Sequence, residues 1–369
     1  MDVNTKIYVA GSGGLVGSAI VRNLESKGYK NLVFTPHSEY DLRNQNTVRD
    51  FFEREKPEVV FTAAAKVGGI VANNTYRAEF IYDNLQIQNN IIHQSYLSGV
   101  KKLLFLGSSC IYPKNSPQPM KEEYLLTSEL EYTNEPYAVA KIAGIKMIES
   151  YNLQYGTDFL AVMPTNLYGY NDNFDLEKSH VLPALIRKMH LAKALNEDVF
   201  CFIRQDLNKM PVEGIDGSAE KADIVRVLKK YGISKNKVVL WGSGKPRREF
   251  LHADDLADAC VYIAENIDFE DILKKNFNIE NPEFPLTDKE VRNTHINIGT
   301  GKDISIKELA ELIKNEVVEF NGEIVWDESM PDGTYQKLLD VSKLRELGWS
   351  AKTDFLSGLK DVYQKYKQY

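Results

Sequence analysis

The sequence predicts a doubly wound α/β fold, in which helices cover both faces of a parallel sheet. The first observation is a series of short and almost wholly apolar runs, which are typical of strands buried on both faces. These runs occupy residues 7–10, 31–35, 59–62, 102–106 and 159–164. The second observation is that helical patterns separate the runs, at residues 15–27, 46–55, 80–98 and 137–155. Strands and helices that alternate in this order build parallel sheets through crossover connections.

The pattern becomes less regular after Gly169, where short elements alternate with glycines and prolines. We therefore predict one domain over residues 1–168, to which some later segments return, and a smaller C-terminal lobe over residues 169–369. Within this lobe, Ser305-Ile-Lys-Glu308 forms a capping box and predicts the start of a helix. Residues 197–237 combine a mixed polar stretch with an amphipathic one, Ala219–Tyr231, and predict an inserted loop and helix.

Composition and charge exclude several classes of protein. The chain has 369 residues, of which 43% are hydrophobic and 26% charged, as in ordinary globular domains. Its net charge of −7 argues against a general nucleic-acid binder. No apolar run approaches the roughly 18 residues of a membrane span. Cys110, Cys201 and Cys260 are far apart and lack C-x-x-C spacing, so we expect no disulfide framework, no metal site and a cytoplasmic protein.

A glycine-rich turn joins the first predicted strand to the first predicted helix. Such a turn lets the backbone approach a pyrophosphate, and the helix N-terminus supplies amide groups and a positive dipole end. The first glycine permits the tight turn, the middle one the close approach, and the last one close packing of helix on strand. Because the strand–turn–helix context is the required one, we predict a Rossmann-type dinucleotide site. The predicted contacts are Gly11, Ser12, Gly13, Gly14, Leu15, Val16 and Gly17.

The side chains at the end of the second predicted strand indicate which dinucleotide binds. It carries Thr35, His37 and Ser38 and lacks the acidic residue that would hold the ribose 2′-hydroxyl of NAD. These side chains could instead donate to a 2′-phosphate, so we predict NADP(H) as the cofactor with His37 among its contacts. The alternative is a polar loop that contacts no ligand.

A second set of polar residues predicts acid–base chemistry. Ser108 follows the strand at 102–106, at the carboxyl edge where doubly wound sheets bind ligands. Tyr137 and Lys141 lie four residues apart, on one face of a predicted helix. A phenol has an ordinary pKa of about 10, and a neighbouring ammonium group stabilises its anion. Ser108 would then bind a substrate oxygen while Tyr137 exchanges its proton. A Tyr-x-x-x-Lys pair alone could arise by chance on an amphipathic helix.

Taken together, these motifs identify a resemblance to the GDP-L-fucose synthase family of extended short-chain dehydrogenases/reductases. The similarity extends over nearly the whole chain, except for the insertion at 197–237 and a looser stretch at 267–293. The blocks that carry it are Ala63–Asn74, Leu106–Pro113, Asn134–Ala143, Met163–Gly169, Ser179–Pro183 and Trp241–His252.

The resemblance implies roles for individual residues. It gives Ser108, Tyr137 and Lys141 the reductase roles, and it makes Cys110 and His180 the acid–base pair of an epimerase. A thiol and an imidazole suit proton transfer at a carbon next to a ketone, although Cys110 could simply be a small buried residue. The implied cofactor contacts are Leu106, Gly107, Ser109, Lys141, Pro164, Thr165, Asn166 and Leu167. The implied substrate contacts are Lys188, Trp241, Arg248 and Asp332.

The expected activity is conversion of a GDP-4-keto-6-deoxy-sugar by C3/C5 epimerisation and NADPH-dependent C4 reduction. With GDP-4-keto-6-deoxymannose as substrate, the product would be GDP-L-fucose. The alternatives are a heptose of the same kind, with or without epimerisation, and a non-catalytic dinucleotide-binding sensor. Some family members carry arginines for the 2′-phosphate where this chain has Gly13, Thr35 and His37. This difference weakens the prediction of NADP over NAD.

The resemblance also implies a homodimer that pairs two helices of each chain. The helices predicted at 80–98 and 137–155 carry apolar residues on more than one face, and a helix that covers one sheet needs only a single apolar stripe. These residues are Ile81, Leu85, Ile91, Ile92, Ile142, Ile145, Ile148 and Leu153. The helices therefore predict a second chain as partner.

Overall fold

A computed structural model describes residues 1–36, 38–330 and 332–368 of the chain. The chain divides into two compact units that are interleaved in sequence. Unit 1 comprises Met1–Leu167, Glu249–Lys302 and Leu338–Lys352. Unit 2 comprises Tyr168–Arg248, Asp303–Lys337 and Thr353–Tyr369. The single domain boundary predicted between residues 168 and 169 is next to the first place where the chain passes from unit 1 into unit 2.

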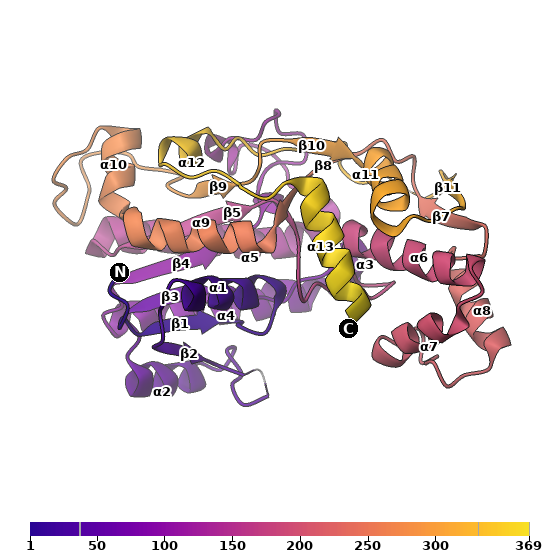
Figure 1. The fold of residues 1–369 in the computed structure, drawn as a ribbon. Helices are drawn as coiled ribbons and strands as arrows, with labels where there is room; N and C mark the ends of the chain where they lie inside the picture. Colours follow the sequence, from indigo (N-terminus) through magenta and orange to yellow (C-terminus); the bar gives the residue numbers. More distant parts are fainter. Residues whose placement is uncertain (37, 331, 369) are drawn as a thin grey trace. The chain divides into compact units, whose positions relative to one another are not determined.

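Unit 1 is built on a six-stranded sheet with the order β2-β1-β3-β4-β5-β9, and every neighbouring pair is parallel (Figure 1). The predicted doubly wound α/β class is thereby confirmed. The strands are β1 (Ile7–Ala10), β2 (Leu32–Phe34), β3 (Val59–Thr62), β4 (Lys102–Leu106), β5 (Phe159–Pro164) and β9 (Ile296–Ile298). The predicted bounds of β1, β3, β4 and β5 agree with the structure. Strand β9, which has only three residues and lies at the edge of the sheet, is not among the predicted strands.

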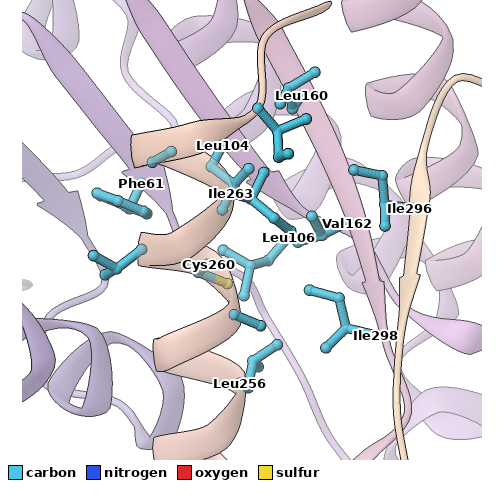
Figure 2. Packing of buried hydrophobic residues seen from close by; sticks show 14 of the residues in the cluster. Phe61, Leu104, Leu106, Leu160, Val162, Leu256, Cys260, Ile263, Ile296 and Ile298 are labelled. Atoms are coloured by element: carbon cyan, nitrogen blue, oxygen red, sulfur yellow. The ribbon is translucent and has the colours of Figure 1, made fainter. Parts of the chain in front are cut away.

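The alternation of side chains along each strand fills two separate cores, one on each face of the sheet. Leu104 and Leu106 of β4 lie in the first core, whereas Leu103 and Phe105 lie in the second. Figure 2 shows the first core, where Leu256, Cys260 and Ile263 of helix α9 lie over the strands. Because both faces are buried, the strands read in the sequence as continuous apolar runs.

Helices α1 and α9 pack on one face of this sheet, and α2, α4 and α5 pack on the other. The helices of unit 1 are α1 (Leu15–Ser26), α2 (Gln45–Glu55), α3 (Ile70–Thr75), α4 (Arg77–Leu97), α5 (Glu135–Tyr155), α9 (Ala253–Asn266), α10 (Phe269–Phe277) and α12 (Ser342–Glu346). Helix α5 ends at Gly156, whose left-handed backbone (φ 66°) terminates the helix. The first four helical patterns of the sequence correspond to α1, α2, α4 and α5.

The mutual packing of α4 and α5 accounts for much of the apolar character from which a partner was predicted. Ile91, Ile92, Ile142, Ile145 and Ile148 all lie in the second core of unit 1. These five residues therefore need no second chain to cover them, and they do not support the predicted dimer.

Unit 2 contains most of the remaining elements of the chain. They are α6 (Val181–Asn196), α7 (Phe200–Lys209), α8 (Lys221–Lys230), β7 (Lys237–Trp241), β10 (Asp303–Ser305), α11 (Ile306–Leu312), β11 (Glu323–Asp327), β12 (Gln336–Lys337) and α13 (Phe355–Gln368). Strands β6 (Asn166–Tyr168) and β8 (Arg247–His252) begin in one unit and end in the other. The predicted capping box at Ser305 is present and starts α11.

The insertion at 197–237 forms two helices, α7 and α8, where the sequence predicted a loop and one helix. Helix α7 packs on α6, and a buried ion pair fixes this contact. The guanidinium group of Arg187 donates to Asp206 from Nε at 2.9 Å and from Nη2 at 2.8 Å. Tyr366 of α13 donates to the second oxygen of Asp206 at 2.5 Å. The insertion is thus part of the core of unit 2.

Within the described part of the chain, no helix is both long enough and apolar enough to cross a bilayer. The same residues contain no group of three acidic, histidine or cysteine side chains that could hold a metal ion.

Candidate active site

The glycine turn between β1 and α1 has the geometry of a phosphate-binding loop. Gly11 has a left-handed backbone (φ 81°), and a Cβ at this position would lie 2.7 Å from the backbone nitrogen of Ala64. A Cβ on Gly17 would lie 2.0 Å from the carbonyl oxygen of Gly11, so the helix can approach the turn only because residue 17 is glycine. A Cβ on Gly13, in contrast, would meet no protein atom within 4 Å.

The first turn of α1 leaves its amide groups available to a ligand. Gly14 occupies the N-cap position and provides no side-chain cap. A Cβ there would approach nothing closer than the Gly11 carbonyl oxygen, at 3.6 Å. The side chains of Leu15 and Val16 pack against the first core, so these residues can contribute only backbone groups. Room beside the loop and an uncapped helix N-terminus together fit a bound diphosphate.

The residues predicted to meet a 2′-phosphate have different placements. His37 lies outside the described residues. Thr35 is buried, and its hydroxyl group is 2.8 Å from that of Tyr8. The Thr35 side chain therefore belongs to the core, which argues against its predicted contact with the phosphate.

Ser108, Tyr137 and Lys141 meet at the carboxyl end of β4. Ser108 caps a 3₁₀ turn (Ser109–Ile111), and its hydroxyl oxygen accepts from the Cys110 amide at 3.4 Å. Tyr137 is hydrogen-bonded to Ser108. The Lys141 ammonium group donates to the Leu106 carbonyl oxygen at 2.7 Å and lies 5.8 Å from the centre of the Tyr137 ring. The first turn of α5 thus places the phenol, and its second turn the ammonium group, beside one strand end.

Burial sets the protonation of this cluster. It raises the pKa of Tyr137 well above 10, and a neighbouring Cys110 thiolate adds to this effect while the hydrogen bond to Ser108 opposes it. Burial also lowers the pKa of Lys141 to about 8, although the Cys110 thiolate acts in the opposite direction. At neutral pH the phenol is therefore protonated and able to donate, and the amine is mostly charged. Helix α5 packs against the 3₁₀ turn that carries Cys110, and both electrostatic effects agree with a position of Cys110 near Tyr137 and Lys141.

Gly107 and Ser109, the two neighbours of Ser108, lie at the same strand end. A Cβ on Gly107 would lie 2.3 Å from the sulfur of Met163, so a larger residue here would require the Met163 side chain to move. Ser109 is buried in the 3₁₀ turn. Further along the sheet edge, the side chains of Thr165 and Asn166 donate to the carbonyl oxygen of Glu249, at 3.2 and 2.9 Å. Pro164 ends β5, and Leu167 packs against the first core.

Unit 2 carries the other predicted site residues. His180 is the N-cap residue of α6, and it provides no side-chain cap. Its side chain reaches the surface, yet nearby protein atoms desolvate the imidazole and lower its pKa. Lys188 follows two turns later, and burial lowers its pKa to about 8. Arg248 of β8 donates from Nη1 to the Thr334 carbonyl oxygen at 2.6 Å, and burial lowers its pKa as well.

The loop after β7 brings Asp332 close to Trp241. The Asp332 carboxylate accepts from the amide and the hydroxyl of Ser243, at 2.9 and 2.6 Å. A Cβ on Gly242 would lie 2.3 Å from the same carboxylate. Trp241 is 62% exposed, which leaves its ring free to cover a ligand. The Asp332 carboxylate therefore fixes the loop after β7 through its hydrogen bonds with Ser243.

Glu249 also lies in this region and is not among the residues predicted from the sequence. It is 0% exposed and lies in β8 next to Arg248. An acidic residue at the start of the apolar run Phe250-Leu251 was the available signal, since buried carboxylates need several donors.

Comparisons with known proteins identify the family. The model of the NAD dependent epimerase/dehydratase family matches residues 7–205 and 214–279. The chain belongs to this family. A protein named putative GDP-L-fucose synthase 2, from Arabidopsis thaliana, is 50% identical over 366 residues, which cover 99% of this chain and 93% of that protein.

Two solved structures are similarly close. One is a GDP-6-OMe-4-keto-L-xylo-heptose reductase from C. jejuni, with 49% identity and a TM-score of 0.90. The other is a GDP-D-glycero-L-gluco-heptose synthase from Campylobacter jejuni in the presence of NADPH, with 48% identity and a TM-score of 0.88. Both alignments cover 100% of this chain and 99% of the other chain.

Proposed function

We propose that the protein converts a GDP-linked 4-keto-6-deoxy-sugar by epimerising C3 and C5 and then reducing C4 with NADPH. With GDP-4-keto-6-deoxy-D-mannose, the product is GDP-L-fucose. The observation that carries the proposal is the cluster of Ser108, Tyr137, Lys141 and Cys110 at the end of β4. It combines the groups needed for reduction with a thiol that reduction alone does not need. The name of the Arabidopsis relative supports the same substrate.

In the epimerisation, Cys110 and His180 transfer protons at carbons next to the ketone. One group removes a proton from one face of the sugar, and the other returns a proton to the opposite face. The lowered pKa of His180 keeps its imidazole neutral at pH 7, so that it can accept a proton. Ser108 binds the ketone oxygen and stabilises the negative charge that develops on it.

In the reduction, Tyr137 donates its proton to the C4 oxygen, which Ser108 orients. Lys141 stabilises the resulting phenolate. The Gly11–Gly17 loop and the open N-terminus of α1 would hold the diphosphate of NADPH, which supplies the hydride to C4. Leu106, Gly107, Ser109, Lys141 and Pro164–Leu167 lie along the sheet edge where the rest of the cofactor would bind. The similar heptose synthase, whose structure was solved in the presence of NADPH, supports this choice of cofactor.

Lys188, Arg248 and Trp241 would bind the GDP part of the substrate. The two cations are partly buried, which strengthens their interaction with a diphosphate. The exposed ring of Trp241 would cover the nucleotide or the sugar. The insertion at 197–237 would border this end of the site, because α7 packs on the helix that carries Lys188.

A GDP-4-keto-6-deoxy-heptose is the second candidate substrate. It is favoured by the two heptose enzymes, which resemble this chain about as closely as the Arabidopsis relative does. Incubation with both GDP-keto-sugars, with products identified by NMR, distinguishes the two substrates.

Two variants separate the two chemistries. Tyr137→Phe lacks the proton donor, so reduction should fall by at least about 10²-fold while exchange at C3 and C5 continues. Cys110→Ala cannot transfer a proton and should lose exchange. The assay measures deuterium incorporation from D₂O into the keto-sugar without NADPH, and NADPH oxidation with it. If Cys110→Ala exchanged deuterium as fast as the unmodified enzyme, the protein would be a plain 4-keto reductase.

The homodimer and the cytoplasmic location belong to the same proposal. Large side chains on the outer faces of α4 and α5 remain exposed and could be covered by a second chain. They are Tyr82, Leu97, Val139 and Tyr155. The location rests on the wide spacing of the cysteines in the sequence.

A further inference from the structure

Glu249 places a carboxylate among backbone amide groups from two separate segments of unit 1. Its Oε1 accepts from the amides of Thr300 and Gly301, at 2.6 and 2.7 Å, and from the Thr300 hydroxyl at 3.3 Å. Its Oε2 accepts from the Leu339 amide at 3.0 Å. A Cβ on Gly299 would lie 2.3 Å from Oε1, so the chain passes directly beside the carboxylate.

The backbone of Glu249 is hydrogen-bonded to a third segment. The Glu249 carbonyl oxygen accepts from the side chains of Thr165 and Asn166. Four separate pieces of chain therefore meet at one residue, which is 0% exposed. Burial raises the pKa of Glu249, whereas the hydrogen bonds that its carboxylate accepts from the backbone amides lower it and favour the ionised form.

These segments lie close to the places where the chain passes from one unit to the other. The chain passes between the two units at five places. Four of these follow Leu167, Arg248, Lys302 and Lys337. Asn166, Glu249, Gly301 and Leu339 each lie within two residues of one of these four places. Glu249 thus links segments of unit 1 close to the points where the chain continues into unit 2.

We propose that Glu249 is a positioning residue, which fixes the four chain segments that join unit 1 to unit 2. The inference rests on the proposed function, because that reaction draws on residues of both units: Cys110 and Tyr137 from unit 1, and His180 and Arg248 from unit 2. Glu249 touches neither substrate nor cofactor in this account. It acts through the segments that it holds.

Glu249→Gln tests this role with little change in size. Three donors face Oε1, so the amide oxygen takes that side and the new NH₂ group faces the Leu339 amide, donor against donor. The bonds from Thr165 and Asn166 are unaffected because they end on the backbone carbonyl oxygen. We expect kcat for both deuterium exchange and NADPH oxidation to fall about tenfold to a hundredfold, as for a small misplacement of reacting groups. The dissociation constants of NADPH and of GDP, measured separately, should change less than about threefold, because each is held mainly by one unit.

Glu149→Gln is the matched control for stability. Glu149 is also a buried carboxylate of unit 1, and it accepts from the amides of Asn293 and Thr294 at 2.7 and 3.4 Å. It also pairs with Lys146 at 2.8 Å, and none of these residues lies within two residues of a connection between the units. Both variants should lower the melting temperature, but only Glu249→Gln should lower kcat. Glu249→Asp keeps the charge and is one methylene shorter, so it carries the test if Glu249→Gln does not fold.

The outcomes separate this inference from the proposed function. If the unmodified enzyme converts neither GDP-keto-sugar, the proposed function fails. If it does convert one, and folded Glu249→Gln and Glu249→Asp keep its kcat, Glu249 is only structural and the inference is wrong. An equal loss of kcat in Glu149→Gln, or a parallel loss of NADPH or GDP affinity, would also overturn it.

Discussion

The pH dependence of GDP binding tests the role of Lys188 quantitatively. The side chain lies on α6, and within the described parts of the chain no carboxylate pairs with it. Burial lowers its pKa from 10.5 to about 8. If the ammonium group binds the diphosphate, then GDP binds mainly to the protonated form, and its affinity must fall as the pH rises through 8.

The size of the effect follows from this pKa. A group with a pKa of about 8 is roughly 90% charged at pH 7, about 50% at pH 8 and about 9% at pH 9. The apparent dissociation constant of GDP should therefore rise about fivefold between pH 8 and 9, and only about twofold between pH 7 and 8. His180 is neutral across this range because its pKa is lowered from 6.5. GDP is the right probe because Lys141, which also has a pKa of about 8, would affect the keto-sugar chemistry.

Isothermal titration calorimetry with GDP at pH 7, 8 and 9 measures this dependence. Lys188→Met should bind GDP more weakly and with little change over this range. Lys188→Arg should keep its charge, so its affinity should stay flat and closer to that of the unmodified enzyme at pH 7. If Lys188→Met shows the same fivefold change between pH 8 and 9 as the unmodified enzyme, Lys188 is not the titrating group and the assignment is refuted.

Three further predictions concern the cofactor, the insertion and the assembly. Gly13→Arg should tighten NADPH relative to NADH by about tenfold to a hundredfold, since the position is open and one charge-assisted hydrogen bond is worth about 1.5–3 kcal/mol. Equal effects on both dinucleotides would contradict it. Asp206→Asn should lower the free energy of unfolding by about 3–5 kcal/mol, because it leaves Arg187 buried without its partner. Asp198→Asn breaks only the exposed pair with Lys235 and should leave the free energy of unfolding almost unchanged in the same denaturation experiment. Light scattering at micromolar concentration should give twice the mass of one chain, and a monomeric mass would exclude the dimer.

The elements that the sequence predicted well are those whose local pattern matches their final environment. Strands β1, β3, β4 and β5 are buried on both faces, so each one is almost wholly apolar. The capping box at Ser305 is a local signal and needs no tertiary contact. In contrast, β9 is a strand of three residues that belongs to the sheet only because a distant part of the chain returns beside β5. Such a return depends on long-range packing, which a local pattern does not contain.

The candidate site also contains some features that a local pattern predicts and others that depend on long-range packing. The glycine turn and the Tyr137–Lys141 spacing are local patterns, so both could be identified without knowledge of the rest of the fold. The buried hydroxyl of Thr35 depends on Tyr8 of the neighbouring strand, which no local pattern reveals. Glu249 was missed for a similar reason, because its donors come from segments near residues 300 and 339. Its importance becomes visible only when these segments are folded together.

The electrostatics of the cluster also favour one order for the two proposed reactions. A thiolate at Cys110 raises the pKa of both Tyr137 and Lys141. While Cys110 carries negative charge during proton exchange, Tyr137 is therefore held in its protonated form and is ready to donate. Once Tyr137 has given its proton to the C4 oxygen, its own anion opposes a second negative charge at Cys110. Epimerisation before reduction avoids two neighbouring anions, and it also uses the C4 ketone, which acidifies the adjacent carbons, before reduction removes it.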